Sequence, residues 1–247
     1  MKKLFCVSLG AVLLLLFSSI VYAQGDPKLT EAWNPVPRVV MPGKTAADPP
    51  ADAIVLFNGK DFSNWKSVEG NDIKWKLENN AFTVTGGSGD IQTKQGFGDC
   101  QLHIEWRAPA EVKGEGQRRG NSGIFFMGRY ELQVLDSYNN STYSNGQAGS
   151  IYKQHIPLVN VCRSPGEWQS YDVIFTAPRF SPDSTIKSTA HMTVFQNGVV
   201  IQNNVTLWGN TVYIGIPKYE MHSDKEPLIL QDHGDAVSYR NIWIRQL

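Results

Sequence analysis

The segment "YELQVLD", residues 130–136, carries two carboxylates and a carboxamide. A carboxyl group can act as a general acid or base when its surroundings bring its pKa near the working pH. Alternate side chains of an extended strand share a face, so Glu131 and Gln133 point the same way. Asp136 joins them only if a bulge or the strand end follows Leu135. The segment therefore predicts a reaction site on one strand face, with a solvated strand surface as the alternative.

A histidine in "LQDHGDAV" is a second candidate for proton transfer, because imidazole titrates near neutral pH. We predict Glu131, Asp136 and His233 as the catalytic residues. The structural alternatives are a salt bridge for Glu131, a turn-capping role for Asp136 and a plain turn position for His233. Gln231 shares the face of His233 if the strand extends that far.

The loop "GQRRGNSG", residues 116–123, has the composition of a ligand-binding turn. Its glycines let the backbone approach a ligand, Asn121 can donate and accept hydrogen bonds, and Arg119 adds a fixed positive charge. A solvated loop with two arginines is the alternative. The polar face of "QLHIEWR" adds Glu105 beside His103. The predicted substrate-binding residues are Glu105, Arg119, Asn121, Gln133, Tyr152, Lys153, His155 and Gln231.

A divalent cation is a further way to stabilise negative charge at such a site. Glu131, Asp136 and His233 could hold it, although no ligand spacing in the sequence requires a metal. The absence of a C-x-x-C pattern argues against a structural zinc site.

The elements that position these residues read as β-strands from Ile54 onward. Short alternating runs flank Asn79-Asn80 and Asn197-Gly198, and both pairs are typical of tight hairpin turns. No stretch has the period of a long amphipathic helix, and 22 glycines and 13 prolines separate the runs. The pattern predicts a single antiparallel sandwich or jelly roll.

The start of the chain predicts export. Residues 1–23 combine two lysines, a short apolar run and a small-residue cleavage pattern, which is typical of a signal peptide. The absence of a cysteine after Ala23 argues against a lipoprotein anchor, so we expect a secreted or periplasmic protein without a membrane span after cleavage. Residues 24–53 predict an extended arm, and residues 54–247 the domain. Cys100 and Cys162 remain open between one disulfide and two thiols.

The 23 basic side chains balance the 23 acidic ones, so the net charge does not suggest binding to nucleic acid. Several stretches together are more informative than any one alone. They are "IVLFNGKDFSNW", "FGDCQLHIEWR", "GQRRGNSGIFF", "YELQVLDS", "GEWQSYDVIF", "HMTVFQNGVVIQ" and "LQDHGDAVSYRNIWIRQL". Their order and spacing over about residues 52–247 resemble the 3-keto-disaccharide hydrolase family, which comprises 3-keto-glycoside hydrolases and 1,2-lyases.

The resemblance implies an all-β, concanavalin-like jelly-roll sandwich and a small carbohydrate substrate already oxidised at C3. A ketone at C3 makes the C2 proton acidic, so the site needs a base, a proton donor for the leaving oxygen and donors for an enolate.

Two other functions remain open from the residues. A non-catalytic carbohydrate-binding sandwich would not need Glu131 or His233. A conventional glycoside hydrolase on this fold would carry E-x-D-x-x-E, whereas this chain has Gln133 in the central position and the shorter Asp136 at the end.

Overall fold

The computed structural model describes residues 25–247, so the predicted signal peptide lies outside the described residues. The chain divides into two compact units, residues 1–39 and 40–247. The described part of the first unit contains one short 3₁₀ helix, η1 (Pro27–Thr30), whose first turn is capped by the Asp26 carboxylate. Within residues 25–247, no helix has the length and apolar character needed to cross a membrane.

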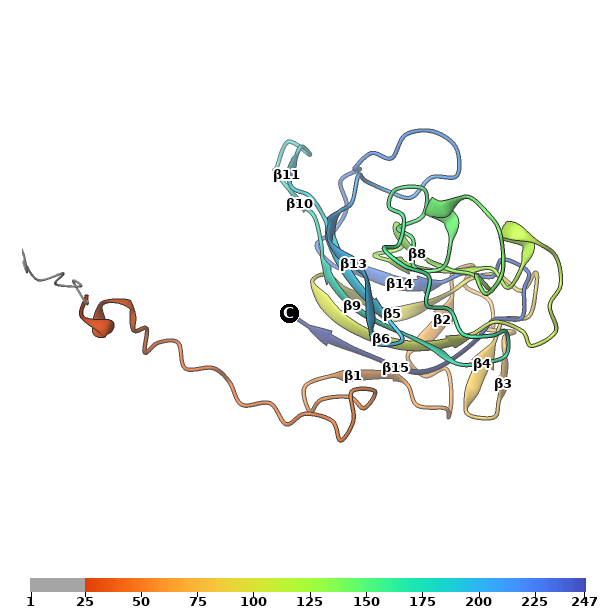
Figure 1. The fold of residues 1–247 in the computed structure, drawn as a ribbon, viewed down its shortest axis with the longest axis horizontal. Helices are drawn as coiled ribbons and strands as arrows, with labels where there is room; N and C mark the ends of the chain where they lie inside the picture. The colour runs from red at the N-terminus through yellow and green to blue at the C-terminus, as the bar shows by residue number, and fades with distance from the viewer. Residues whose placement is uncertain (1–24) are drawn as a thin grey trace, which may run out of the picture. The chain divides into compact units, whose positions relative to one another are not determined.

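The second unit is built from two antiparallel sheets (Figure 1). The larger sheet has the spatial order β13 (Val199–Thr206), β12 (His191–Gln196), β9 (Gln169–Thr176), β6 (Cys100–Arg107), β15 (Ser238–Gln246), β4 (Ala81–Thr83) and β3 (Lys76–Glu78), with β1 (Ile54–Phe57) also paired to β15. The smaller sheet has the order β2 (Trp65–Ser67), β5 (Ile91–Phe97), β14 (Glu226–Leu230), β7 (Ser122–Phe126) and β8 (Tyr130–Val134). The remaining elements are the ribbon β10 (Arg179–Phe180) with β11 (Ile186–Ser188), and the 3₁₀ turns η2 (Gly116–Arg118) and η3 (Ser144–Gly146).

The core forms where the apolar faces of the two sheets meet. Strand β6 contributes Leu102, Ile104 and Trp106, and strand β8 contributes side chains at alternate positions, including Leu132 and Val134. Because successive side chains of a strand point to opposite faces, the residues between them face away from this core. The predicted all-β fold of packed antiparallel sheets is confirmed.

Both predicted hairpins are present. Asn79 and Asn80 have positive φ between β3 and β4, and Asn197 and Gly198 have positive φ between β12 and β13. Asparagine and glycine enter this left-handed region at the least cost, so these turns fix the registers of their strand pairs. Cys100 and Cys162 are both free thiols.

The later part of the predicted arm, from Val40, belongs to the second unit. It is fastened along strand β15: Asn241 Nδ2 and Trp243 Nε1 both donate to the Ala47 carbonyl at 2.9 Å, and Arg245 pairs with Asp52 at 2.8 Å.

Candidate functional site

A cavity of about 280 Å³ lies on the outer face of the smaller sheet. Strand pairing sets Phe125 opposite Glu131, and Gly123 opposite Gln133. The backbone N–H of Gln231 donates to the Gly123 carbonyl at 3.0 Å, which brings the chain beyond β14 into the same row. The face opposite the core therefore gathers polar groups from three segments that are far apart in the sequence.

Six of the residues around this cavity were predicted from the sequence, and Phe125, Thr211 and Tyr213 were not. The lining consists of Asn121, Phe125, Glu131, Gln133, Tyr152, Thr211, Tyr213, Gln231 and His233. Its volume is near the lower end of the range of about 300–1,000 Å³ that is usual for ligand pockets. Flat rings and carboxamides surrounding a carboxyl group suit a small polar ring such as a pyranose.

Glu131 is the buried carboxyl group of this cavity, with only 5 % of its surface exposed. Within residues 25–247, no hydrogen bond or ion pair reaches its carboxylate oxygens. Burial penalises the charged form and raises the pKa of Glu131 to about 8. A carboxyl group with such a pKa can exchange a proton near neutral pH, as a general acid or base requires.

Gly123 provides the space beside that carboxyl group. A Cβ at this position would lie 2.9 Å from Glu131 Oε1, 2.7 Å from Phe125 Cε2 and 3.3 Å from Gln231 Oε1. Real Cβ atoms do not approach other atoms so closely, so a larger residue would displace the carboxyl group or the ring. The sequence signal was the glycine at the end of "GQRRGNSG", whose role becomes visible only with the strand pairing.

Two loops cover the cavity, and both are tied to the strand that carries Glu131. The Glu131 N–H donates to Thr211 Oγ1 at 3.0 Å, and the Tyr152 N–H donates to the Glu131 carbonyl at 3.2 Å. Lys153 joins the loops to each other: its Nζ donates to the Tyr213 carbonyl at 2.6 Å and lies 4.1 Å from the Tyr213 ring centre. Lys153 thus holds the walls together without lining the cavity.

The carboxamides beside Glu131 are oriented by a neighbouring loop. Gln133 Nε2 donates to Gln117 Oε1 at 3.0 Å, and Asn121 Nδ2 donates to the Gln117 carbonyl at 2.7 Å. The Asn121 backbone N–H donates to Asp235 Oδ2 at 2.8 Å. Fixed amide groups of this kind can present N–H donors to a developing negative charge at little reorganisation cost. His233 lies at the exposed edge of the same cavity.

The structure does not bring Asp136 together with Glu131. Strand β8 ends at Val134, and Asp136 turns toward Arg119, whose Nε donates to Asp136 Oδ2 at 2.7 Å. Both residues line a separate cavity of about 300 Å³. The cation site suggested for Glu131, Asp136 and His233 is consequently not assembled. Among residues 25–247, no group of three or more His, Cys, Asp or Glu side chains is arranged to hold a metal ion.

Two other predicted substrate-binding residues also lie outside the cavity. His155 Nε2 is 2.7 Å from the Thr206 carbonyl, and the His155 ring packs on Trp208. Glu105 lies on β6 in the larger sheet, where Arg240 Nε donates to its Oε2 at 2.6 Å. Neither residue touches the Glu131 cavity.

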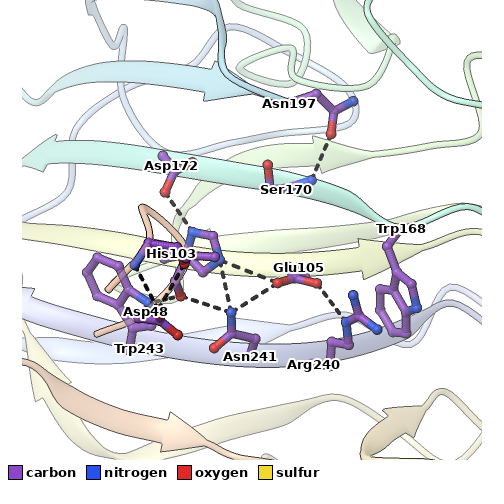
Figure 2. A network of polar contacts seen from close by, with 12 residues as sticks. Asp48, His103, Glu105, Trp168, Ser170, Asp172, Asn197, Arg240, Asn241 and Trp243 are labelled. Carbon is purple, nitrogen blue, oxygen red and sulfur yellow. Dashed lines mark hydrogen bonds and ion pairs between the residues drawn. The ribbon is translucent and has the colours of Figure 1, made fainter. Parts of the chain in front are cut away.

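Glu105 belongs to a polar network on the outer face of the larger sheet, which Figure 2 shows. His103 Nδ1 lies 2.6 Å from Asp172 Oδ1, and His103 Nε2 lies 3.8 Å from Glu105 Oε1. The Asn241 amide donates to the Ala47 carbonyl and to Glu105 Oε1, so neither of its protons is left for His103. Burial acts to lower the pKa of His103, but the hydrogen bonds to Asp172 and Glu105 outweigh it and raise this pKa to about 9.

Comparison with known proteins identifies the family of the chain. Residues 52–245 match the model of the 3-keto-alpha-glucoside-1,2-lyase-like domain family. The chain belongs to this family.

Relatives agree with this membership. A 3-keto-disaccharide hydrolase of Bacteroides thetaiotaomicron is 25 % identical, with 80 % of each chain covered. A solved structure from Parabacteroides distasonis, provisionally named as a glycosyl hydrolase, is 52 % identical with a TM-score of 0.86, covering 92 % of this chain and 98 % of that one. A second such structure from the same organism, at 22 % identity and a TM-score of 0.57, covers 79 % of this chain and 94 % of that one and shares the fold. Together with the family, the first two support a carbohydrate-active hydrolase.

Proposed function

We propose that this protein of the 3-keto-alpha-glucoside-1,2-lyase-like family cleaves glycosides whose sugar ring carries a ketone at C3, and that Glu131 removes the C2 proton. One observation carries the proposal. Among the nine described residues that line the cavity, Glu131 is the only carboxyl group, and it is buried without a partner.

A lone carboxyl group distinguishes the candidate reactions. Conventional glycosidases use two carboxyl groups that flank the glycosidic bond, about 5–9.5 Å apart depending on stereochemical outcome. The second acid that such a mechanism needs is absent from the described lining, because Asp136 is paired with Arg119 in the separate cavity. An elimination from a 3-keto sugar needs only one base in contact with the ring. A binding module would gain nothing from an unpaired buried acid, which costs stability when it ionises.

The proposed reaction proceeds in two balanced steps. Ionised Glu131 takes the proton from C2, and the electron pair of that C–H bond forms an enolate with the C3 ketone. The enolate then re-forms the ketone and a C1–C2 double bond while the bond from C1 to the leaving oxygen breaks. The leaving oxygen takes a proton and departs as an alcohol. Addition of water to C1, with a proton returned to C2, converts the unsaturated product to the net product of hydrolysis.

The other polar groups of the cavity fit the remaining tasks. The carboxamides of Asn121 and Gln231 offer N–H donors for the enolate oxygen, which is the group that gains charge during proton removal. Gln133 donates both of its N–H groups within the protein, to Gln117 and Gly146, and so shapes the wall of the cavity. His233 at the open edge can supply the proton to the leaving oxygen. Phe125, Tyr152 and Tyr213 provide flat surfaces for the sugar ring.

We also propose that the protein works outside the cytoplasm. The motivation is the signal-peptide pattern of residues 1–23 in the sequence. Fractionation of expressing cells, with mass spectrometry of the mature N-terminus, tests this: cleavage after Ala23 supports export, and an intact N-terminus in the cytoplasmic fraction overturns it.

The function itself is tested with a matched pair of substrates in deuterium oxide. An aryl glucoside and its 3-keto counterpart, of the same anomeric configuration, are incubated with the protein. We expect release of the aglycone from the keto substrate alone, and NMR should show deuterium at C2 of the recovered keto sugar. Equal cleavage of both substrates, or a cleaved keto sugar that retains its original C2 proton, would contradict proton abstraction.

A further inference from the structure

The turn that carries His233 lies beyond the end of strand β14. That strand ends at Leu230, and the Gln231 N–H still donates to the Gly123 carbonyl at 3.0 Å. Residues 232–235 belong to no strand, so strand pairing does not fix their backbone. Among residues 25–247, no hydrogen bond reaches the His233 ring, which is exposed. The placement of this ring therefore depends on the backbone of the turn.

Asp232, the residue before His233, holds the turn through its carboxylate. Its Oδ2 accepts hydrogen bonds from the Ser88 N–H at 2.7 Å and from the Gly89 N–H at 3.0 Å. Its Oδ1 accepts a hydrogen bond from the Gly234 N–H at 2.9 Å. Hydrogen bonds from backbone N–H groups to an ionised carboxylate are stronger than those between neutral groups. Asp232 thus joins the turn to the loop before strand β5.

This loop, residues 86–90, also holds the turn through two further contacts. The Asp232 N–H donates to Asp90 Oδ1 at 2.8 Å. A Cβ at Gly86 would lie 2.7 Å from the Gly234 carbonyl oxygen, which is closer than real Cβ atoms approach other atoms. The backbone of the turn therefore lies directly against the backbone of the 86–90 loop, and glycine at position 86 permits this approach.

The other end of the turn is fixed to the start of strand β7. Asp235 Oδ2 accepts a hydrogen bond from the Asn121 N–H at 2.8 Å. Gly234 has a φ of +96°, a conformation that glycine adopts without strain. His233 thus lies between two anchored aspartates, Asp232 and Asp235, and its backbone has little freedom to move.

Fixed placement matters for the task proposed for His233. A general acid acts only within hydrogen-bond reach of the atom that it protonates. A displacement of about 1 Å, even one caused from a distance, can lower a rate about 10²-fold. Because His233 is exposed, side-chain packing contributes little to its placement. The hydrogen bonds of Asp232 are consequently the main restraint on the N-terminal side of His233.

We propose that Asp232 is a positioning residue, whose carboxylate holds His233 where it can protonate the leaving oxygen. The proposal rests on the proposed function, which gives His233 that task. It adds a role for an acid that does not line the Glu131 cavity. Asp232 itself exchanges no proton with the substrate.

The proposal is tested with two 3-keto-glucosides of the same configuration, one with a methyl and one with a para-nitrophenyl leaving group. Nitrophenolate departs without a proton, whereas an alkoxide needs an acid. Asp232→Asn keeps one carbonyl oxygen, which cannot serve the N–H groups on both sides of the carboxylate. We expect kcat/KM to fall about tenfold or more on the methyl substrate and less than about threefold on the nitrophenyl substrate.

The matched control is Asp99→Asn. Asp99 Oδ1 also accepts a backbone N–H from a distant segment, that of Ala177 at 2.7 Å, but Asp99 lies outside the Glu131 cavity. Its replacement should leave the ratio of the two kcat/KM values unaltered. Gly86→Ala is a second test variant, because it keeps Asp232 but displaces the turn at the Gly234 carbonyl. It should show the same selective loss on the methyl substrate.

A double-mutant cycle separates positioning from a general structural role. His233→Gln should show a selective loss at least as large as that of Asp232→Asn. Adding Asp232→Asn to His233→Gln should cost less than about a further twofold, since residues that act as a unit are not additive. Equal losses on both substrates in Asp232→Asn, or a full loss when His233 is already replaced, would overturn the positioning role while the proposed cleavage stands. If wild-type protein cleaves neither keto substrate, the proposed function itself fails.

Discussion

The two outer faces of the sandwich each contain a buried titratable side chain. One of these side chains has no charged partner, and the other lies against two carboxylates. On the smaller sheet, Glu131 has no partner for its carboxyl group among the described residues, and burial alone raises its pKa to about 8. On the larger sheet, His103 lies against Asp172 and Glu105, which raise its pKa to about 9 in spite of burial (Figure 2). Near neutral pH Glu131 is therefore mostly protonated, with an ionised fraction that can act as a base and grows toward pH 8, whereas His103 is held charged.

This difference indicates that Glu131 is available for proton transfer, whereas His103 stabilises the fold. Burying an acid without a partner costs free energy when the acid ionises, and proteins tolerate that cost where the proton is used. The His103 network satisfies its charges internally and borders the segment that Asn241 and Trp243 hold at Ala47. Glu131, which is buried without a partner, and Glu105, which is less deeply buried and paired with Arg240, therefore have different roles.

The largest expected difference between the two faces is in activity, and it is tested by neutralising Glu131 and Glu105 in separate variants. Glu131→Gln should reduce kcat/KM on a 3-keto-glucoside by about 10²–10⁴-fold, the usual contribution of a general base. Glu105→Gln is the matched control and should stay within about threefold, because Glu105 lies outside the cavity. Steady-state kinetics with both variants would contradict the comparison if the two losses were alike.

Both pKa values are raised, so both groups make stability fall as pH rises, but His103 does so by losing a stabilising charge and Glu131 by gaining a destabilising one. His103 contributes stability that is complete below about pH 6.5 and is lost as pH rises through about 9, so His103→Gln should cost about 1.5–3 kcal/mol at pH 6 and less at pH 10. Glu131 destabilises the fold increasingly between about pH 4.5 and 8, so Glu131→Gln should raise Tm at pH 9 and hardly at pH 4. Thermal unfolding across this range checks both signs. A His103→Gln variant as stable as wild type at pH 6, or a Glu131→Gln variant no more stable than wild type at pH 9, would show that the faces do not differ in this way.

Two glycines, one on each face, allow the same substitution to be compared for its effect on activity and on stability. Gly123→Ala should lower kcat by about tenfold, about 1.4 kcal/mol, because the new Cβ would lie 2.9 Å from Glu131 Oε1. Gly198→Ala, in the hairpin turn beside the His103 network, has open space for its Cβ but a φ of +81°. It should therefore cost stability of about 1 kcal/mol, with kcat unaltered. Steady-state kinetics and denaturant unfolding of both variants check these expectations. Full activity of Gly123→Ala would contradict the role of Gly123 in providing space beside the Glu131 carboxyl group.

The smallest expected effect concerns the loops over the Glu131 cavity. Lys153→Met keeps much of the side-chain length but removes the charge that lies against the Tyr213 ring and its carbonyl. We expect KM to rise about threefold with kcat little changed, since an exposed cation–π contact is worth about 0.5–1 kcal/mol. Lys66→Met, at an exposed position on β2, is the control. A fall in kcat at constant KM would instead place Lys153 in the chemistry.

Local patterns determined most of the fold. The alternation in "QLHIEWR" and "YELQVLD" and the Asn79-Asn80 and Asn197-Gly198 turns depend on residues a few positions apart, so strands and hairpins follow from the sequence. The same alternation placed Glu131 and Gln133 on one face. The ordered motifs, in addition, pointed to the family.

Tertiary structure decided which of the candidate residues meet. The pairing of β7 with β14 joins residues that are about a hundred positions apart, and no local pattern reports such a register. The end of β8 at Val134 turned Asp136 toward Arg119, and the separation of the two sheets removed Glu105 from the cavity. Thr211 and Tyr213 entered the site because a loop covers that face, and Phe125 entered it because β7 pairs with β8. The sequence by itself supplied the strands and the reactive side chains, whereas only packing fixed their neighbours, because burial and charge partners arise from distant segments.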